Sequence, residues 1–197
     1  HIGYLIPFVE NANWVNPVFW TLAVEFQYYL ALSLFFPLVL TGKLLYRSIF
    51  YALFIGGGFA TLSYAFFPHW SPYFLAGIIY ILMRKEVISK IEFGVMALIL
   101  MPVIYFNLGL VDLIIAISSL AVIHYFSNFK TKLTLFLGKI SYSLYLIHSM
   151  IGAAFINYLS HIYREPYQKF LVISLGFVIS VGSAYILYRF VEKPSHK

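Results

Sequence analysis

Charge is scarce in this sequence. Only 10% of its 197 residues are Asp, Glu, Lys or Arg, whereas 62% are hydrophobic and the mean hydropathy is +0.87. Soluble domains usually contain nearer to about 25% charged residues. A chain of this length cannot bury so much apolar surface in a water-soluble core, so lipid must be the solvent for most of it. The composition therefore excludes a soluble globular domain and indicates a polytopic membrane protein.

Cysteine is absent, which excludes a disulfide framework and a thiolate metal site within these residues. Acidic residues are few, at seven against 13 basic residues, and the net charge is +6. In a soluble protein this excess would suggest nucleic acid. Here the basic residues fall between apolar runs, where membrane topology explains them better. We therefore expect a membrane-lipid environment and no nucleic-acid partner.

Apolar runs of roughly helical-span length occupy most of the chain. They are too long for membrane β-strands and do not alternate apolar with polar residues. The predicted fold is all-α, a polytopic transmembrane bundle of about seven membrane-spanning helices without a separate soluble domain. The predicted spans cover approximately residues 18–40, 47–67, 71–84, 92–107, 110–127, 138–160 and 167–190.

Helix-breaking residues divide these runs. Pro37 and Gly42 are expected to close the first run, and Pro68 and Pro72 to bracket a loop. Pro102 lies inside the fourth run and predicts a kink there.

Basic residues then give an orientation. If the seven spans alternate and the C-terminal tail is cytoplasmic, eleven of the 13 basic residues face the cytoplasm. Only Arg164 and Lys169 face outward. Such a split follows the positive-inside rule, so we expect a multi-pass protein of the plasma membrane with a cytoplasmic C-terminus.

Glu25 is an acidic residue set well inside an apolar run. In the expected topology it lies roughly 10 Å below the outer end of its helix. Thr21, Glu25, Tyr28 and Tyr29 share one helical face, and such a polar face must look into a bundle or a cavity rather than at lipid. Glu25 either binds a polar substrate or handles a proton, or it fixes helix packing through hydrogen bonds. The spacing leaves both readings open.

A second polar face lies on the sixth run, where Ser141, Tyr145, His148 and Gly152 fall together. His148 sits near the middle of the membrane and could carry a proton or donate a hydrogen bond. A histidine that only satisfies local packing is the alternative. We expect no metal site, because no second histidine or cysteine stands at ligand spacing on this run.

Small residues elsewhere favour structure over chemistry. Gly56–Gly58 resembles no phosphate loop and indicates close helix packing, as do Gly176 and Ser180 in the last run. Asp112 begins the fifth run, where a carboxylate is favourable for the helix dipole. His124 is expected to be interfacial.

Three segments of the chain form a further set of motifs. Trp20–Leu30 reads WTLAVEFQYYL, with a tryptophan and a glutamate in one apolar segment. Leu137–His148 reads LGKISYSLYLIH and ends in histidine. Tyr188–Pro194 contains a glutamate, a basic residue and a proline. In the same order and across nearly the whole chain, all three resemble motifs of the membrane-bound acyltransferase 3 family.

The resemblance implies an integral-membrane O-acyltransferase of the inner (plasma) membrane. Such enzymes transfer an acyl group, commonly acetyl from acetyl-CoA, to a hydroxyl of a cell-surface carbohydrate or lipid-linked glycan. No bound cofactor is implied, because acyl-CoA is the donor substrate. The residues that match family positions are catalytic candidates Glu25 and His148 and substrate-binding candidates Trp20, Thr21, Tyr28, Ser141 and Tyr145. A proton-coupled transporter or flippase for a glycan or an acyl donor is the alternative function.

The start of the sequence departs from the family plan. Residue 1 is His, and no cleavable leader precedes the first run, so we expect residues 1–197 to be the C-terminal part of a single transmembrane domain. The resemblance implies that earlier helices carry a catalytic histidine and an arginine pair, so residues 1–197 alone should be inactive. Phe26 replaces a common second acid, and Val18 replaces a frequent histidine.

Overall fold

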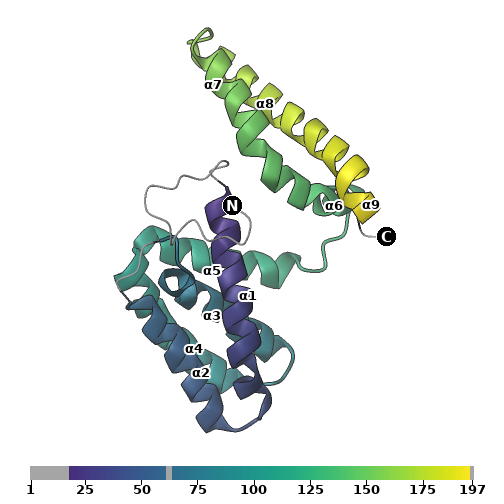
Figure 1. The fold of residues 1–197 in the computed structure, drawn as a ribbon. Helices are drawn as coiled ribbons and strands as arrows, with labels where there is room; N and C mark the ends of the chain where they lie inside the picture. Colours follow the sequence, from purple (N-terminus) through teal and green to yellow (C-terminus); the bar gives the residue numbers. More distant parts are fainter. Residues whose placement is uncertain (1–17, 61–63, 196–197) are drawn as a thin grey trace. The chain divides into compact units, whose positions relative to one another are not determined.

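The computed structural model describes residues 18–60 and 64–195. These residues form helices joined by short turns, and the described part of the chain contains no β-strand (Figure 1). The predicted all-α fold is confirmed. From Trp20 onward the chain divides into two compact units, Trp20–Asn128 and Phe129–Lys197.

The first unit contains five helices, each close to a predicted run. They are α1 (Phe19–Leu40), α2 (Leu44–Gly58), α3 (Phe67–Arg84), α4 (Lys90–Leu108) and α5 (Leu110–Phe126). The second unit is a helical hairpin. Its first arm is α6 (Lys132–Ile147), the π-helical segment η2 (His148–Ala153) and α7 (Ala154–Ser160), and its second arm is α8 (Pro166–Leu187), the π-helical segment η3 (Tyr188–Glu192) and α9 (Lys193–Ser195).

Neighbouring helices of the first unit run antiparallel. The first turns of α1 and α3 meet at Trp20 and Trp70, whose ring centroids lie 6.1 Å apart. The start of α5 reaches the same region, where Tyr73 donates a hydrogen bond to Asp112. The starts of α2 and α4 meet through the Arg47–Glu92 ion pair, at 2.9 Å. Successive helices therefore alternate in direction, as a multi-pass chain requires.

Four helical runs of the described residues are long and apolar enough to cross a membrane: Phe19–Leu40, Lys90–Leu108, Lys132–Ser160 and Pro166–Ser195. Two further apolar helices, Leu44–Gly58 and Leu110–Phe126, are shorter. The chain is a membrane protein, and a count of seven crossings stays a prediction.

The expectation that Pro68 and Pro72 bracket a loop was wrong. Both prolines lie in the first turns of α3, which begins at Phe67. Proline is tolerated at Pro68 because the first amides of a helix have no intrahelical partner. Pro72 has no N–H to bond the Pro68 carbonyl, and the Ser71 hydroxyl lies 2.7 Å from that oxygen instead. Pro37 is likewise inside α1, and Gly42, with φ of +70°, follows its end.

Glycines allow close contact between helices in both units. A Cβ added at Gly58 would lie 2.5 Å from Pro72 Cγ, so α2 and α3 pack closely there. In the second unit a Cβ at Gly152 would overlap the Ser180 hydroxyl, and one at Gly176 would lie 2.6 Å from Ile156 Cγ1. The predicted packing role is confirmed for Gly58, Gly176 and Ser180, whereas nothing lies within 4 Å of a Cβ at Gly56.

Candidate functional site

Glu25 lies on α1 at the edge of its packed face. Ala23 and Val24 are buried, whereas the Glu25 side chain is exposed. No described residue makes a hydrogen bond or ion pair with the Glu25 carboxylate. A carboxylate at membrane depth without a partner is costly unless it faces a cavity or a ligand. The alternative that Glu25 fixes helix packing through hydrogen bonds therefore has no support among the described residues of this unit.

The predicted polar face of α1 divides into two environments. Thr21 and Glu25 line a cavity, together with Trp20. Tyr28 instead packs into the helix bundle, where its ring stacks on Phe74 with centroids 4.2 Å apart. Tyr29 is 61% exposed. The structure thus brings Trp20, Thr21 and Glu25 together and places Tyr28 in the adjacent packing layer.

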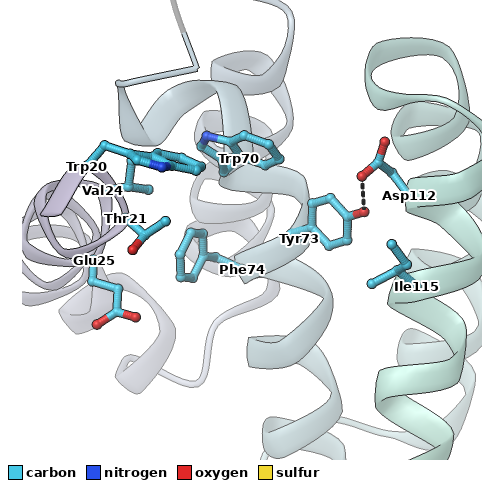
Figure 2. Close-up of a pocket in the computed structure, with 9 residues that line it drawn as sticks. All are labelled: Trp20, Thr21, Val24, Glu25, Trp70, Tyr73, Phe74, Asp112 and Ile115. Carbon is cyan, nitrogen blue, oxygen red and sulfur yellow. Dashed lines mark hydrogen bonds between the residues drawn. The ribbon is translucent and has the colours of Figure 1, made fainter. Parts of the chain in front are cut away.

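The cavity has a volume of about 370 Å³ and lies across one face of α3 (Figure 2). We call it the α3 groove. Its lining comes from three helices: Trp20, Thr21, Val24 and Glu25 from α1, Trp70, Tyr73 and Phe74 from α3, and Asp112 and Ile115 from α5. The α1 and α5 residues lie on opposite sides, with the α3 aromatic rings between them (Figure 2).

Asp112 is a groove residue that sequence reasoning did not find. Its carboxylate accepts a hydrogen bond from the Tyr73 hydroxyl, with 3.0 Å between Oη and Oδ1. The position at the start of α5 explains an acidic residue by the helix dipole alone. No local pattern indicates that this turn contacts α3 at the groove, because the contact depends on how α3 and α5 pack.

Gln27 joins α1 to the start of α3 through two hydrogen bonds. Its Oε1 accepts the backbone N–H of Phe67 at 2.9 Å, and its Nε2 donates to the Ala65 carbonyl at 3.3 Å. The Phe67 amide is one of the first amides of α3, which lack intrahelical partners. The α1 segment that carries Glu25 therefore also fixes the start of the helix that forms the groove floor.

His148 lies in the second unit, at the start of the π-helical segment η2. Its Nδ1 is 2.8 Å from the Tyr145 carbonyl oxygen. Because a carbonyl only accepts, the neutral ring carries its hydrogen on Nδ1 and leaves Nε2 with a lone pair. Single π-helical turns occur frequently at functional sites.

The predicted face of the sixth run is confirmed as one surface. Ser141, Tyr145, His148 and Gly152 all line a second cavity, of about 810 Å³, between the two arms of the hairpin. Most of the remaining lining is apolar. Glu25 and His148 belong to different units, so each is described only within its own surroundings.

A buried hydroxyl–carboxylate pair lies at the open end of the hairpin. Ser143, which is 1% exposed, donates to Glu192 Oε2 at 2.6 Å. Glu192 ends the second π-helical segment, η3. The contact joins two segments that are far apart in sequence, and it fixes α6 against the end of α8. Within the described residues, no group of three histidine, aspartate or glutamate side chains could hold a metal ion.

Comparison with known families decides the assignment. A family profile described as an acyltransferase domain matches residues 2–189, nearly the whole chain. The chain belongs to the acyltransferase 3 family. No curated protein and no solved structure gives a significant match. In this acyltransferase, the α3 groove carries the first of the family-like segments, Trp20–Leu30, and the hairpin carries the other two.

Proposed function

We propose that this protein is an O-acyltransferase that transfers an acyl group, with acetyl the expected one, from acyl-CoA to a hydroxyl of a cell-surface carbohydrate or lipid-linked glycan. Family membership supports acyl transfer. The observation that carries the proposal further is the unpartnered Glu25 carboxylate in a groove that also holds Trp20 and Trp70. Aromatic faces and a carboxylate are a suitable environment for the apolar and hydroxyl surfaces of a sugar.

Glu25 has the chemistry to orient the acceptor hydroxyl or to share in its deprotonation. A carboxylate accepts a hydrogen bond from a hydroxyl, and acid–base assistance of this kind contributes about 10²–10⁴-fold to rate. His148, with Nε2 able to accept a proton, is the second candidate group, and Ser141 and Tyr145 shape its cavity. Tyr28 contributes by holding Phe74 at the groove.

Charge distribution supports the orientation. The groove lies near the starts of α1, α3 and α5, and the Arg47–Glu92 pair lies at the starts of α2 and α4. With basic loops on the cytoplasmic side, the groove opens toward the outer face of the inner (plasma) membrane and the C-terminus is cytoplasmic. An extracytoplasmic carbohydrate would reach the groove from that side.

The experiment is replacement of Glu25 by Gln in the complete protein, with acyl esters on the surface glycan measured by mass spectrometry. Glu25→Gln keeps size and hydrogen bonding but removes the carboxylate, so ester formation should fall by about 10²-fold or more. Glu86→Gln is the matched control, because Glu86 is exposed in the turn between α3 and α4 and lies outside the groove. Normal acylation by a well-expressed Glu25→Gln protein would remove Glu25 from the catalytic mechanism.

The same experiment separates acyl transfer from transport. A proton-coupled transporter or flippase that used Glu25 and His148 would lose glycan export in the Glu25→Gln variant. An acyltransferase would lose the ester while the amount of exported polymer stayed unchanged. We expect the second result.

A further inference from the structure

The α3 groove has a carboxylate on each side. Glu25 lies on the α1 side and Asp112 on the α5 side, with Trp70, Tyr73 and Phe74 of α3 between them (Figure 2). The three α3 residues are spaced i, i+3 and i+4, so their rings present one continuous aromatic floor. The function proposed above uses the α1 side and the aromatic floor. The α5 side, Asp112 and Ile115, has no role in it.

Tyr73 holds Asp112 in a defined orientation. The hydrogen bond from the Tyr73 hydroxyl uses Asp112 Oδ1, at 3.0 Å. A carboxylate has about four lone-pair positions on its two oxygens, and no other described residue donates to this one. Oδ2 therefore keeps its accepting capacity. The helix dipole alone would explain an acid at the start of α5. It would not explain why Asp112 accepts a hydrogen bond from α3 and lines the groove.

Two carboxylates restrict which ligands the groove can take. An anionic group placed in the groove is repelled by both carboxylates. The charge therefore opposes the phosphates of acyl-CoA, phospholipid head groups and acidic sugars. It favours an uncharged molecule whose hydroxyls donate to both acids while its C–H face lies on the aromatic floor. Neutral pyranosides have these properties.

We propose that the α3 groove is the acceptor subsite, that Asp112 held by Tyr73 is its second sugar-binding carboxylate, and that the pair selects a neutral sugar over an acidic one. Glu25 then meets the hydroxyl that is acylated, and Asp112 accepts from a hydroxyl elsewhere on the bound glycan. This inference rests on the proposed function for the identity of the reaction, but sugar binding can be measured without it.

Intrinsic fluorescence provides a direct measurement, because two of the three tryptophans of this sequence, Trp20 and Trp70, line the groove. The complete protein in lipid nanodiscs is titrated with methyl β-glycosides of glucose, galactose, mannose and N-acetylglucosamine. The uronic-acid counterpart of each hexose, which differs only at C6, is titrated in parallel. We expect a saturable change in emission with at least one neutral glycoside and a Kd at least tenfold weaker for its uronide.

Variants assign that signal to the groove. Asp112→Asn still accepts the Tyr73 hydrogen bond but loses its charge, so neutral-glycoside binding should weaken about tenfold and the preference over the uronide should shrink to within threefold. Tyr73→Phe, which releases Asp112, should weaken neutral-glycoside binding less than Asp112→Asn does.

Trp70→Phe, or Trp20→Phe if the former folds poorly, should remove the emission change. Glu86→Gln and Tyr105→Phe, both at exposed positions outside the groove, are the matched controls.

The outcomes separate this inference from the proposed function. Absence of an emission change with every glycoside, or equal binding by Asp112→Asn and the unchanged protein, overturns the subsite. Either result would overturn the subsite even if surface acylation still depended on Glu25, so the proposed function would be retained. If a transferable acceptor is available, Asp112→Asn should raise its KM about tenfold and leave the KM for acyl-CoA within twofold. A fall in kcat with unchanged acceptor KM would instead overturn the binding role.

Discussion

At the scale of single residues, the first family-like segment combines two roles on one helix. Glu25 presents a carboxylate to the α3 groove. Two residues later, Gln27 bonds the chain just before α3 through both atoms of its amide. A glutamine at this position is therefore explained by the architecture of the groove and needs no contact with substrate.

Replacing Gln27 by Leu should destabilise the first unit. The change removes two hydrogen bonds and leaves the Phe67 amide without its partner, which costs about 1–3 kcal/mol for a buried donor. Thermal unfolding in detergent can be monitored by the height of the monodisperse peak in size-exclusion chromatography. The unfolding midpoint of Gln27→Leu should be lower than that of the unchanged protein.

Asn107→Leu is the matched control for that change. Asn107 Nδ2 is buried and has no hydrogen-bond partner among the described residues, so replacing this amide should cost little or stabilise slightly. Equal losses for the two variants would contradict the specific role of Gln27.

Residue-level reasoning from the sequence found residues that line cavities where the signal was local. An acid in an apolar run marks Glu25 without any structure, and the helical spacing of Ser141, Tyr145 and His148 marks their shared surface. Asp112 was missed because its significance comes from the Tyr73 contact between two helices. Tyr28 shares the polar spacing of Glu25, yet its large ring is better placed against Phe74. Pattern alone does not separate these environments.

At the scale of elements, the apolar runs predicted the helices well and their ends less well. The second run was extended to residue 67, whereas α2 ends at Gly58 and α3 begins at Phe67. Hydropathy does not change across this connection, because its residues are themselves apolar and aromatic. The Pro72 position was misassigned because proline was expected to interrupt the helix, whereas α3 continues through Pro72 with the Ser71 hydroxyl 2.6 Å from the Phe54 carbonyl oxygen and 2.7 Å from that of Pro68.

Glycine substitutions test the close packing of these elements, because each contact glycine can be compared with a helical glycine that has no close neighbour. Gly58→Ala places a methyl group against the Pro72 ring and should cost about 1–3 kcal/mol. Nothing lies within 4 Å of a Cβ at Gly56, so Gly56→Ala should be neutral or stabilising by up to about 1 kcal/mol. Gly152→Ala and Gly182→Ala, on opposite arms of the hairpin, give the same contrast.

Thermal unfolding of the four alanine variants measures this contrast directly. The midpoint should fall for Gly58→Ala and Gly152→Ala and stay level or rise for Gly56→Ala and Gly182→Ala. A fall for all four variants would show that backbone freedom, and not contact between helices, accounts for the glycines.

At the scale of the whole molecule, orientation follows from charge. The described helices of the first unit alternate in direction, and their basic ends gather where Arg47 meets Glu92. Within the second unit, the hairpin turn lies near Arg164 and the opposite end carries Arg189 and Lys193. The orientation stays a prediction, and it comes from the sequence alone, since counting charges between apolar runs requires no tertiary contact. The short helices α2 and α5 are the elements on which the alternation depends.

The absence of cysteine from this sequence makes the orientation directly testable. Single cysteines are introduced at Lys85, Lys130 and Arg164, which lie in or beside the turns after α3, after α5 and after α7. Any native cysteine elsewhere in the complete protein is first replaced by serine. Intact cells are treated with a membrane-impermeant maleimide. Arg164→Cys should label at once, whereas Lys85→Cys and Lys130→Cys should label only after permeabilisation.

The position at Lys130 decides between alternative topologies, because it follows α5, which is only 17 residues long. If α5 crosses the membrane, Lys130 lies on the same side as Lys85, and Leu110→Cys at the other end of α5 labels in intact cells. If α5 lies in the interface instead, Lys130 and Leu110 label alike. That result would also move Asp112 away from a membrane-embedded position, so the topology experiment bears directly on the second carboxylate of the α3 groove.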